Sequence, residues 1–220
     1  MLSDPLTLLV IAVAAIIGWR LWSVLGQRTG FEREWPRPLE GPSPKAIDMS
    51  PDREKTVPAT SDWSKYGRGD ASLAKALSDI AGRDRTFNPE SFLAGASRAY
   101  EMINSAFAKG DKKALQPLLS REIMKEFSAD IDRMQAAGER MSWQLVKVES
   151  TEMKNASLSG NLARIDVHFT SSVISSTVDK DGKIVEGHMT AIEHVEDVWT
   201  FERATNLSDP NWKLVATTPQ

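Results

Sequence analysis

The sequence contains no cysteine, only three histidines and only two tyrosines among 220 residues. Without cysteine there are no disulfides, no thiol nucleophile and no cysteine-based zinc site. The chain also lacks the patterns of a P-loop, a dinucleotide-binding glycine loop, a serine-hydrolase elbow and a zinc-protease helix. A formal net charge of −3 provides no basic excess for a nucleic-acid partner. We therefore expect no cofactor, no metal, no nucleic acid and no catalytic residue.

Two histidine-bearing segments are the remaining candidates for chemistry. His168 shares a strand face with Asp166, and an Asp–His pair can transfer protons. That face lies opposite Ile165, Val167 and Phe169, so we expect it to face water. The stretch from Glu186 to Asp197 is rich in acidic residues and contains His188 and His194, but its spacing matches no metal site. We expect this stretch to be a solvated loop.

Long apolar runs are scarce, and the single one lies at the N-terminus. Residues 6–19 carry no charge, and extending the run to Leu25 gives 20 residues, about 30 Å of helix, enough to cross the hydrocarbon layer. A cleaved signal peptide is the alternative, but such peptides begin with basic residues, and here only Asp4 precedes the run. We predict a membrane anchor at residues 1–26. The residues expected in it include Leu6, Ile11, Ile16, Trp19, Arg20 and Trp22.

Charges flanking the apolar run predict its orientation. No Lys or Arg precedes it, whereas Arg20, Arg28, Arg33 and Arg37 follow closely. Because basic residues stay on the cytoplasmic side, the C-terminal bulk is expected in the cytoplasm. For a bacterial chain this means a single-pass protein of the inner (cytoplasmic) membrane. Residues 27–70 form a predicted linker, since six of the 11 prolines fall between Pro36 and Pro58.

Residues 71–220 read as one α+β domain in which helices precede an antiparallel sheet. Asp70, Asn88, Asp111 and Ser120 each precede a helical pattern and can cap it, and Gly138 ends the last helix. After Gly138 the apolar period changes to two, which predicts strands. Residues 155–161 are turn-rich, and Asp181-Gly182 predicts a hairpin turn. The arrangement expected is helices packed on one face of a curved sheet, giving a cone.

The apolar faces of these elements supply the candidate site. In the last two strands Trp199 and Phe201 share one face, as do Trp212 and Leu214. Such residues either fill a core or line a ligand pocket, and both interpretations remain open. The candidate pocket or core residues are Tyr100, Ile103, Phe107, Phe127, Ile165, Val167, Phe169, Trp199, Phe201, Trp212 and Leu214.

Four phrases of the sequence resemble the Tim44-like domain family. They are FNPESFLAGASRAYEMINSAFAKGD, SREIMKEF, VWTFER and DPNWKLVA, in this order. The resemblance covers about residues 71–218, and bacterial members of the family share the layout of anchor and linker. It implies a cone-shaped fold similar to nuclear transport factor two, with an apolar pocket. The family is not known for catalysis.

The resemblance also implies a function. The mitochondrial member tethers a heat-shock chaperone to the protein-import channel and contacts cardiolipin-rich membrane. By analogy, this chain is expected to be a membrane-anchored, non-enzymatic adaptor that docks a chaperone or a translocase component. The alternative is a domain that binds lipid or another apolar ligand at the membrane surface, anionic lipid included. An enzyme built on the cone is a third hypothesis, and it requires a buried, perturbed carboxylate or histidine in the pocket. The sequence does not specify an oligomeric state.

The anchor at residues 1–26 predicts behaviour in fractionation. An integral helix stays in the bilayer when peripheral contacts are removed, so the protein is expected in the membrane pellet after alkaline carbonate washing. Immunoblotting of pellet and supernatant measures this. Release into the supernatant would contradict the anchor.

Overall fold

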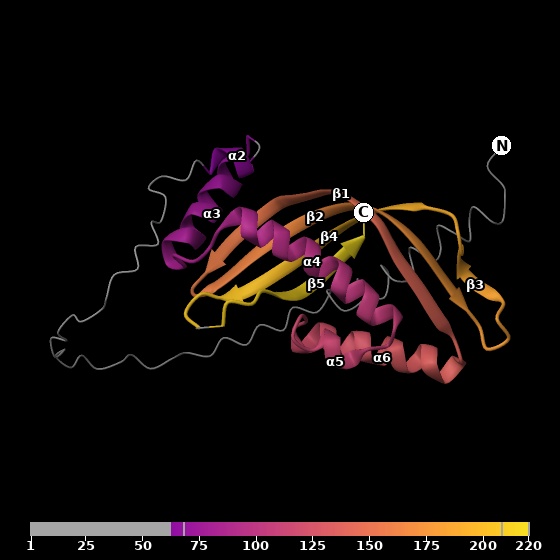
Figure 1. Ribbon diagram of the computed structural model, residues 1–220. Helices are drawn as coiled ribbons and strands as arrows, with labels where there is room; N and C mark the ends of the chain where they lie inside the picture. Colours follow the sequence, from indigo (N-terminus) through magenta and orange to yellow (C-terminus); the bar gives the residue numbers. More distant parts are fainter. Residues whose placement is uncertain (1–62, 68, 208, 220) are drawn as a thin grey trace, which may run out of the picture.

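The computed structural model describes residues 63–67, 69–207 and 209–219 of the chain. These residues form five helices followed by five strands (Figure 1). The helices are α2 (Ser64–Gly67), α3 (Ala71–Arg83), α4 (Pro89–Ala108), α5 (Lys112–Leu115) and α6 (Arg121–Ala137). The strands are β1 (Arg140–Ser159), β2 (Leu162–Val178), β3 (Ile184–Gly187), β4 (Glu193–Ala204) and β5 (Lys213–Pro219). The predicted membrane anchor and most of the predicted linker lie outside the described residues.

Side-chain caps start the helices where the sequence predicts them. The carboxylate of Asp70 accepts from the amides of Ser72 and Leu73 at the start of α3. The side chain of Asn88 accepts from the Ser91 amide at 2.9 Å, and Pro89 occupies the first position of α4. Such a cap satisfies a backbone donor that the helix itself leaves unpaired. Asp111 and Ser120 cap α5 and α6 in the same way, and Gly138 ends α6 with a φ of +70°.

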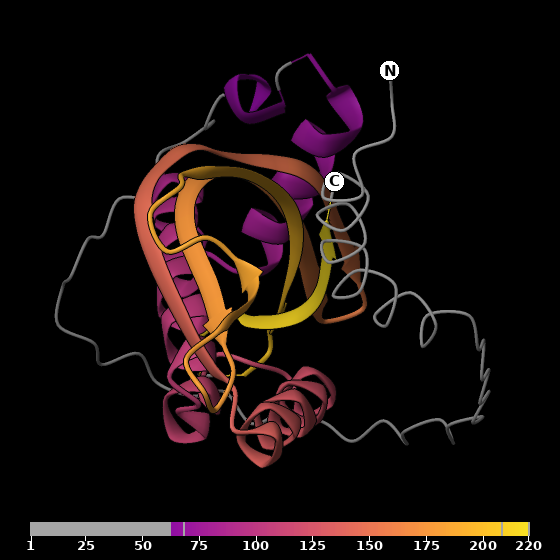
Figure 2. The same cartoon turned by 90° about the vertical axis from the view of Figure 1, so that its right-hand side faces the viewer.

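The five strands form one antiparallel sheet in the order β1-β2-β4-β5. β3 pairs with the far end of β2, beyond the part that pairs with β4. Three register shifts interrupt the long β1–β2 pairing, and such bulges bend a strand and increase its twist. Figure 2 shows the strongly curved sheet end on. The α+β class and the curved antiparallel sheet predicted from the sequence are confirmed.

The inner, concave face of the sheet carries the core. β2 places Ala163, Ile165, Val167 and Phe169 on this face, and all four are buried. α4 covers them with an apolar stripe that includes Phe92 and Tyr100. Helices and sheet therefore bury their apolar faces against each other in the way that the α+β pattern requires.

The predicted turn at residues 155–161 is wrong over most of its length. β1 continues to Ser159, and only Gly160 and Asn161 make the turn into β2. Ala156 is buried and pairs with Ile165 across the strands. Pairing with an apolar neighbouring strand outweighs the weak strand preference of Asn, Ser and Gly. The predicted hairpin turn at Asp181-Gly182 is confirmed, since it joins β2 to β3.

A buried ion pair links the start of the domain to its end. Arg203 of β4 donates to the carboxylate of Asp84, which follows α3, at 2.5 Å. Only 9% of the Arg203 side chain and 6% of the Asp84 side chain are exposed. The other oxygen of the Asp84 carboxylate accepts from the amide and hydroxyl of Thr86. A buried carboxylate with these partners fixes the turn between α3 and α4 against the sheet.

Aromatic packing continues N-terminally beyond residue 71. The ring of Trp63 stacks on that of Phe87, with centroids 6.3 Å apart, and Tyr66 of α2 donates to Glu90 of α4 at 3.0 Å. The sequence alone leaves open whether Trp63 contacts a partner, a membrane or nothing. In the structure, Trp63 packs against the core of the domain through Phe87.

Gly187 allows β3 to lie close against β2. Its φ is +70°, and a β-carbon there would lie against the carbonyl oxygen of Ser175. The amide of His188 donates to the same carbonyl, so the oxygen is held in place. We expect Gly187→Ala to detach β3 from β2 and to speed hydrogen exchange at residues 184–188 at least about tenfold, which corresponds to a local loss of at least about 1.4 kcal/mol.

Gly160→Ala is the matched control for this prediction. Gly160 has a φ of +60°, but a β-carbon at this position would have no neighbouring atom within 4 Å. The control therefore carries the conformational cost without the steric clash, about 1 kcal/mol at its own turn. Equal protection of residues 184–188 in wild type and Gly187→Ala would refute the role assigned to Gly187.

Candidate functional site

The candidate residues gather on the concave side of the sheet. Eight are buried, and Phe107, Phe127 and Trp212 are half-buried and pack against the same core. The buried eight are Tyr100, Ile103, Ile165, Val167, Phe169, Trp199, Phe201 and Leu214.

Tyr100 of α4 lies at the centre of the aromatic contacts. Its ring stacks on Phe169 of β2, with centroids 4.6 Å apart, and lies 4.8 Å from that of Trp199 of β4. Trp199 in turn contacts Phe201, its neighbour on the inner face. Each such aromatic pair contributes on the order of 1 kcal/mol beyond the area it buries.

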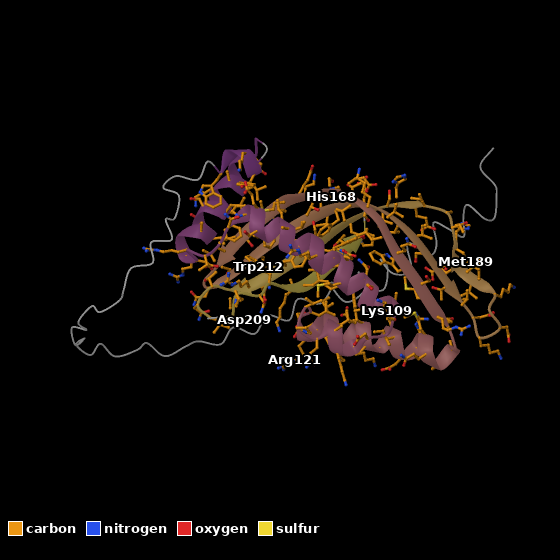
Figure 3. The ribbon with its side chains drawn as sticks, in the orientation of Figure 1. Lys109, Arg121, His168, Met189, Asp209 and Trp212 are labelled. Carbon is orange, nitrogen blue, oxygen red and sulfur yellow. The ribbon has the colours of Figure 1, made fainter. Side chains whose placement is uncertain are left out.

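The aromatic contacts continue from Phe201 toward the N-terminal end of the domain. Phe92 makes an edge-on contact with Phe201 and lies 4.8 Å from Trp212, which is labelled in Figure 3. Phe87 contacts both Phe92 and Trp212, and Trp63 stacks on Phe87. The ring of Trp143 in β1 also contacts Tyr100, with centroids 6.4 Å apart. We call this connected set, from Tyr100, Trp143 and Phe169 to Trp63, the aromatic cluster. Phe107 and Phe127 form a separate pair between α4 and α6.

A small polar group lies within the aromatic cluster. The hydroxyl of Tyr100 is 2.9 Å from the hydroxyl of Ser171 and donates to the carboxylate of Asp197 at 3.3 Å. Asp197 precedes Trp199 by two residues in β4, so its side chain points to the same inner face. Ser171 lies on the inner face of β2 and is buried.

The position of Asp197 corrects the prediction that residues 186–197 form a solvated loop. Residues 193–197 belong to β4, and Glu186 belongs to β3. The signal is present in the sequence, because two-residue alternation back from Phe201 and Trp199 reaches Asp197. The strand that this alternation predicts over residues 194–204 is confirmed, and the density of charge misleads only about the solvation of the stretch.

Burial dominates the electrostatics of the polar group. Loss of water raises the pKa of the Asp197 carboxyl, and this outweighs the hydrogen bond from Tyr100 and the charge of His168, which lower it. Burial, assisted by the negative charge of Asp197, likewise raises the pKa of the Tyr100 hydroxyl. At neutral pH the phenol therefore keeps its proton and donates it in a hydrogen bond.

His168 lies on the outer face of the sheet, as predicted, but its neighbours cover most of it. Its Nε2 lies 3.3 Å from the Glu196 carboxylate, and only 15% of its side chain is exposed. Asp166 accepts instead from the hydroxyl of Thr200 at 2.8 Å. His194 lies 3.1 Å from the hydroxyl of Ser172, which donates to Glu149.

Two of the clefts on the outside of the domain are lined by no residue of the aromatic cluster. One lies between α3 and β1, is lined by Leu73, Glu152 and Met153 among others, and has a volume of about 330 Å³. The other lies between Arg83 and Leu158. A buried carboxylate beside a phenol has the groups for proton transfer, but neither cleft brings a substrate to it.

Among the described residues, no helix is both long and apolar enough to cross a bilayer.

The raised pKa of Asp197 generates a stability prediction. The folded state carries the cost of a buried charge at pH values above the ordinary range of aspartate, and the cost disappears as pH falls and the carboxyl is protonated. Asparagine keeps an oxygen for the Tyr100 hydroxyl. We expect Asp197→Asn to raise the melting temperature at pH 7 by about 2–4 °C. In a domain of this size, such a shift corresponds to a stabilisation of about 1 kcal/mol. The increase in melting temperature should become smaller toward pH 4.

Thermal unfolding followed by circular dichroism between pH 4 and 8 measures this difference. Asp166→Asn is the matched control, because it removes a carboxylate from the outer face of the same sheet. A lower melting temperature for Asp197→Asn than for wild type at pH 7 would show that the charge of Asp197 stabilises the fold.

Comparison with known proteins identifies the family. The Tim44-like domain matches residues 73–219. The mitochondrial import inner membrane translocase subunit TIM44-1 of Arabidopsis thaliana is 23% identical over 147 residues, which cover 64% of this chain. The match covers 31% of the plant protein, so this chain spans about a third of the relative's length.

Two solved structures align with part of this chain at low sequence identity. The intermembrane space region of the chloroplast protein ARC6 is 13% identical and aligns with a TM-score of 0.44, covering 60% of this chain and 96% of that one. A putative dehydratase of the NTF2-like family from Streptomyces avermitilis is 16% identical, with a TM-score of 0.35, covering 60% of this chain and 99% of that one. With the family match extending over most of the described residues, the chain belongs to the Tim44-like domain family.

Proposed function

We propose that this chain is a membrane-anchored, non-enzymatic adaptor whose cytoplasmic domain docks a protein partner, a chaperone or a translocase component, at the bacterial inner membrane. Membership of the Tim44-like family supports a role in protein transport. The observation that carries the proposal is the aromatic cluster, because it occupies the inner face that a ligand-binding cone would leave open. A partner then has to be recognised on the outer surface.

The proposed organisation follows from the sequence. Residues 1–26 anchor the chain in a single pass, residues 27–70 link the anchor to the domain, and residues 71–220 form the domain. The contact between Trp63 and Phe87 supports a packed unit that begins somewhat earlier, within the proposed linker. The basic residues after the apolar run support a cytoplasmic position for the domain.

The packing of the interior also argues against the two alternative functions, lipid binding and catalysis. A lipid binder needs an apolar volume open to its ligand, and rings packed with centroids less than 5 Å apart fill the space around Tyr100. An enzyme needs a reactive group that a substrate can reach. Asp197 meets the requirement for a buried, perturbed carboxylate, but its enclosure beside Tyr100 favours a structural role.

Site-specific photocrosslinking in living cells tests the proposal. A photoreactive phenylalanine is placed at exposed positions on three elements, Met102 of α4, Val185 of β3 and Leu207 of the β4–β5 loop. The interior control is Trp199, which is 4% exposed. We expect a discrete protein adduct, identified by mass spectrometry, from at least one exposed position and none from Trp199.

The same experiment separates the alternatives. A lipid adduct at Trp199, without protein adducts from the exposed positions, would replace the adaptor by a lipid-binding function. A chaperone or translocase component in the adduct would identify the partner class.

A further inference from the structure

Exposed apolar side chains are concentrated at one end of the sheet. Of the eight large apolar side chains exposed among the described residues, four fall within residues 184–192, here called the β3 arm. They are Ile184, Val185, Met189 and Ile192, with exposed fractions of 42–65%. Figure 3 shows Met189 at the end of the sheet beside β3, far from Trp212. Apolar side chains gathered in this way are typical of an interaction surface.

The backbone of β3 also has one edge that can pair with a further strand. β3 pairs with β2 along one side, and no other strand of the described residues pairs with its second side. Gly187 and the hydrogen bond from the His188 amide to Ser175 hold the strand against β2. A fixed strand with a free edge can accept an extended segment from another chain.

The β3 arm also carries a carboxylate, Glu186, with other carboxylates near it. Glu186 is half-buried, and the charges of Glu139 and Glu193 act on it together with burial to raise its pKa. Arg133 opposes this effect, but it lies 3.7 Å from Glu139, with which it forms an ion pair. Residues 179–197 as a whole contain six acidic residues and two lysines, so negative charge is in excess around Glu186. A Lys or Arg from outside would relieve the excess negative charge.

We propose that the β3 arm is the docking site for the partner and takes an extended protein segment that carries apolar side chains and Lys or Arg residues. The inference rests on the proposed adaptor function and adds the surface and the chemistry of the partner to it. Apolar side chains of the segment cover Ile184, Val185 and Met189, its backbone pairs with the free edge of β3, and its basic residues face Glu186 and Glu193.

Charge disfavours two other occupants of this surface, an anionic membrane and a second copy of the chain. An anionic membrane would bring lipid phosphates toward Glu139, Glu186 and Glu193, and like charges repel. A second copy joined through the same edge would place Glu186 and Glu193 against the same carboxylates of its partner. Only a basic partner combines burial of the apolar side chains with compensation of the acidic group.

Defined peptides test the proposal on the full chain in detergent micelles. A fluorescein-labelled ten-residue peptide of alternating valine and lysine is compared with one in which glutamate replaces lysine. We expect fluorescence anisotropy to show saturable binding of the lysine peptide and at least tenfold weaker binding of the glutamate peptide. Val185→Asp should weaken binding of the lysine peptide at least about tenfold, since a buried Val contributes about 1.5–3 kcal/mol.

A second variant keeps the test independent of folding. Glu186→Gln preserves shape, and it should weaken binding about threefold and flatten its salt dependence, as expected for a charge pair at the edge of an interface. The matched control is Leu207→Asp, a similar change at an exposed apolar residue in the β4–β5 loop. Its affinity for the lysine peptide should equal that of wild type.

Several results would overturn the docking site. One is equal binding of the lysine and glutamate peptides. Another is binding of the lysine peptide that neither Val185→Asp nor Glu186→Gln changes. A third is that Val185→Asp abolishes only binding to phosphatidylglycerol vesicles. Conversion of a dimer to a monomer by Val185→Asp in sedimentation velocity would reassign the arm to self-association. If the arm fails while Met102 or Leu207 yields a protein adduct in cells, the adaptor function stands and its docking site lies elsewhere.

Discussion

The fold depends on how β2 is paired and what it carries on its inner face. This strand forms ladders with β1, β3 and β4, so three of the other four strands are positioned through it. Its inner face lays Ile165, Val167 and Phe169 against α4. A flat strand of 17 residues could not do this, because its ends would extend past the helix. The register shifts of β1 curve the pair, and the curvature creates the concave face that α4 fills.

Filling that face determines what the domain can offer to other molecules. The aromatic cluster and the apolar residues around it occupy the interior, and the carboxylate of Asp197 is held there by Tyr100, which also contacts Ser171. In the proposed function, recognition takes place on the outer surface, where apolar side chains of the β3 arm are exposed and Glu186 provides a carboxylate. A core of this kind supports the proposed adaptor function.

Local features of the sequence predicted much of the fold. The caps at Asp70 and Asn88, the helix end at Gly138 and the turn at Asp181-Gly182 depend on a few neighbouring residues, so a single sequence reveals them. The continuation of β1 through Asn155 and Ala156 could not be predicted in this way, because it depends on pairing with β2. The candidate core residues follow from strand alternation, whereas the contact of Trp63 with Phe87 and the ion pair of Asp84 with Arg203 join segments that no periodicity links.

The Asp84–Arg203 ion pair joins residues 119 positions apart, and this has a consequence for biosynthesis. A ribosome releases the chain from its N-terminus, so α3 and α4 emerge long before the strand that anchors them. The β1–β2 hairpin can form as soon as it emerges, since its partners are neighbours in sequence. Asp84, Phe87 and Phe92 have to wait for Arg203 and Trp212. Until the last strands are synthesised, the nascent chain therefore presents an uncovered aromatic face and a carboxylate without its arginine partner. It is during this interval that the chain most needs protection from aggregation.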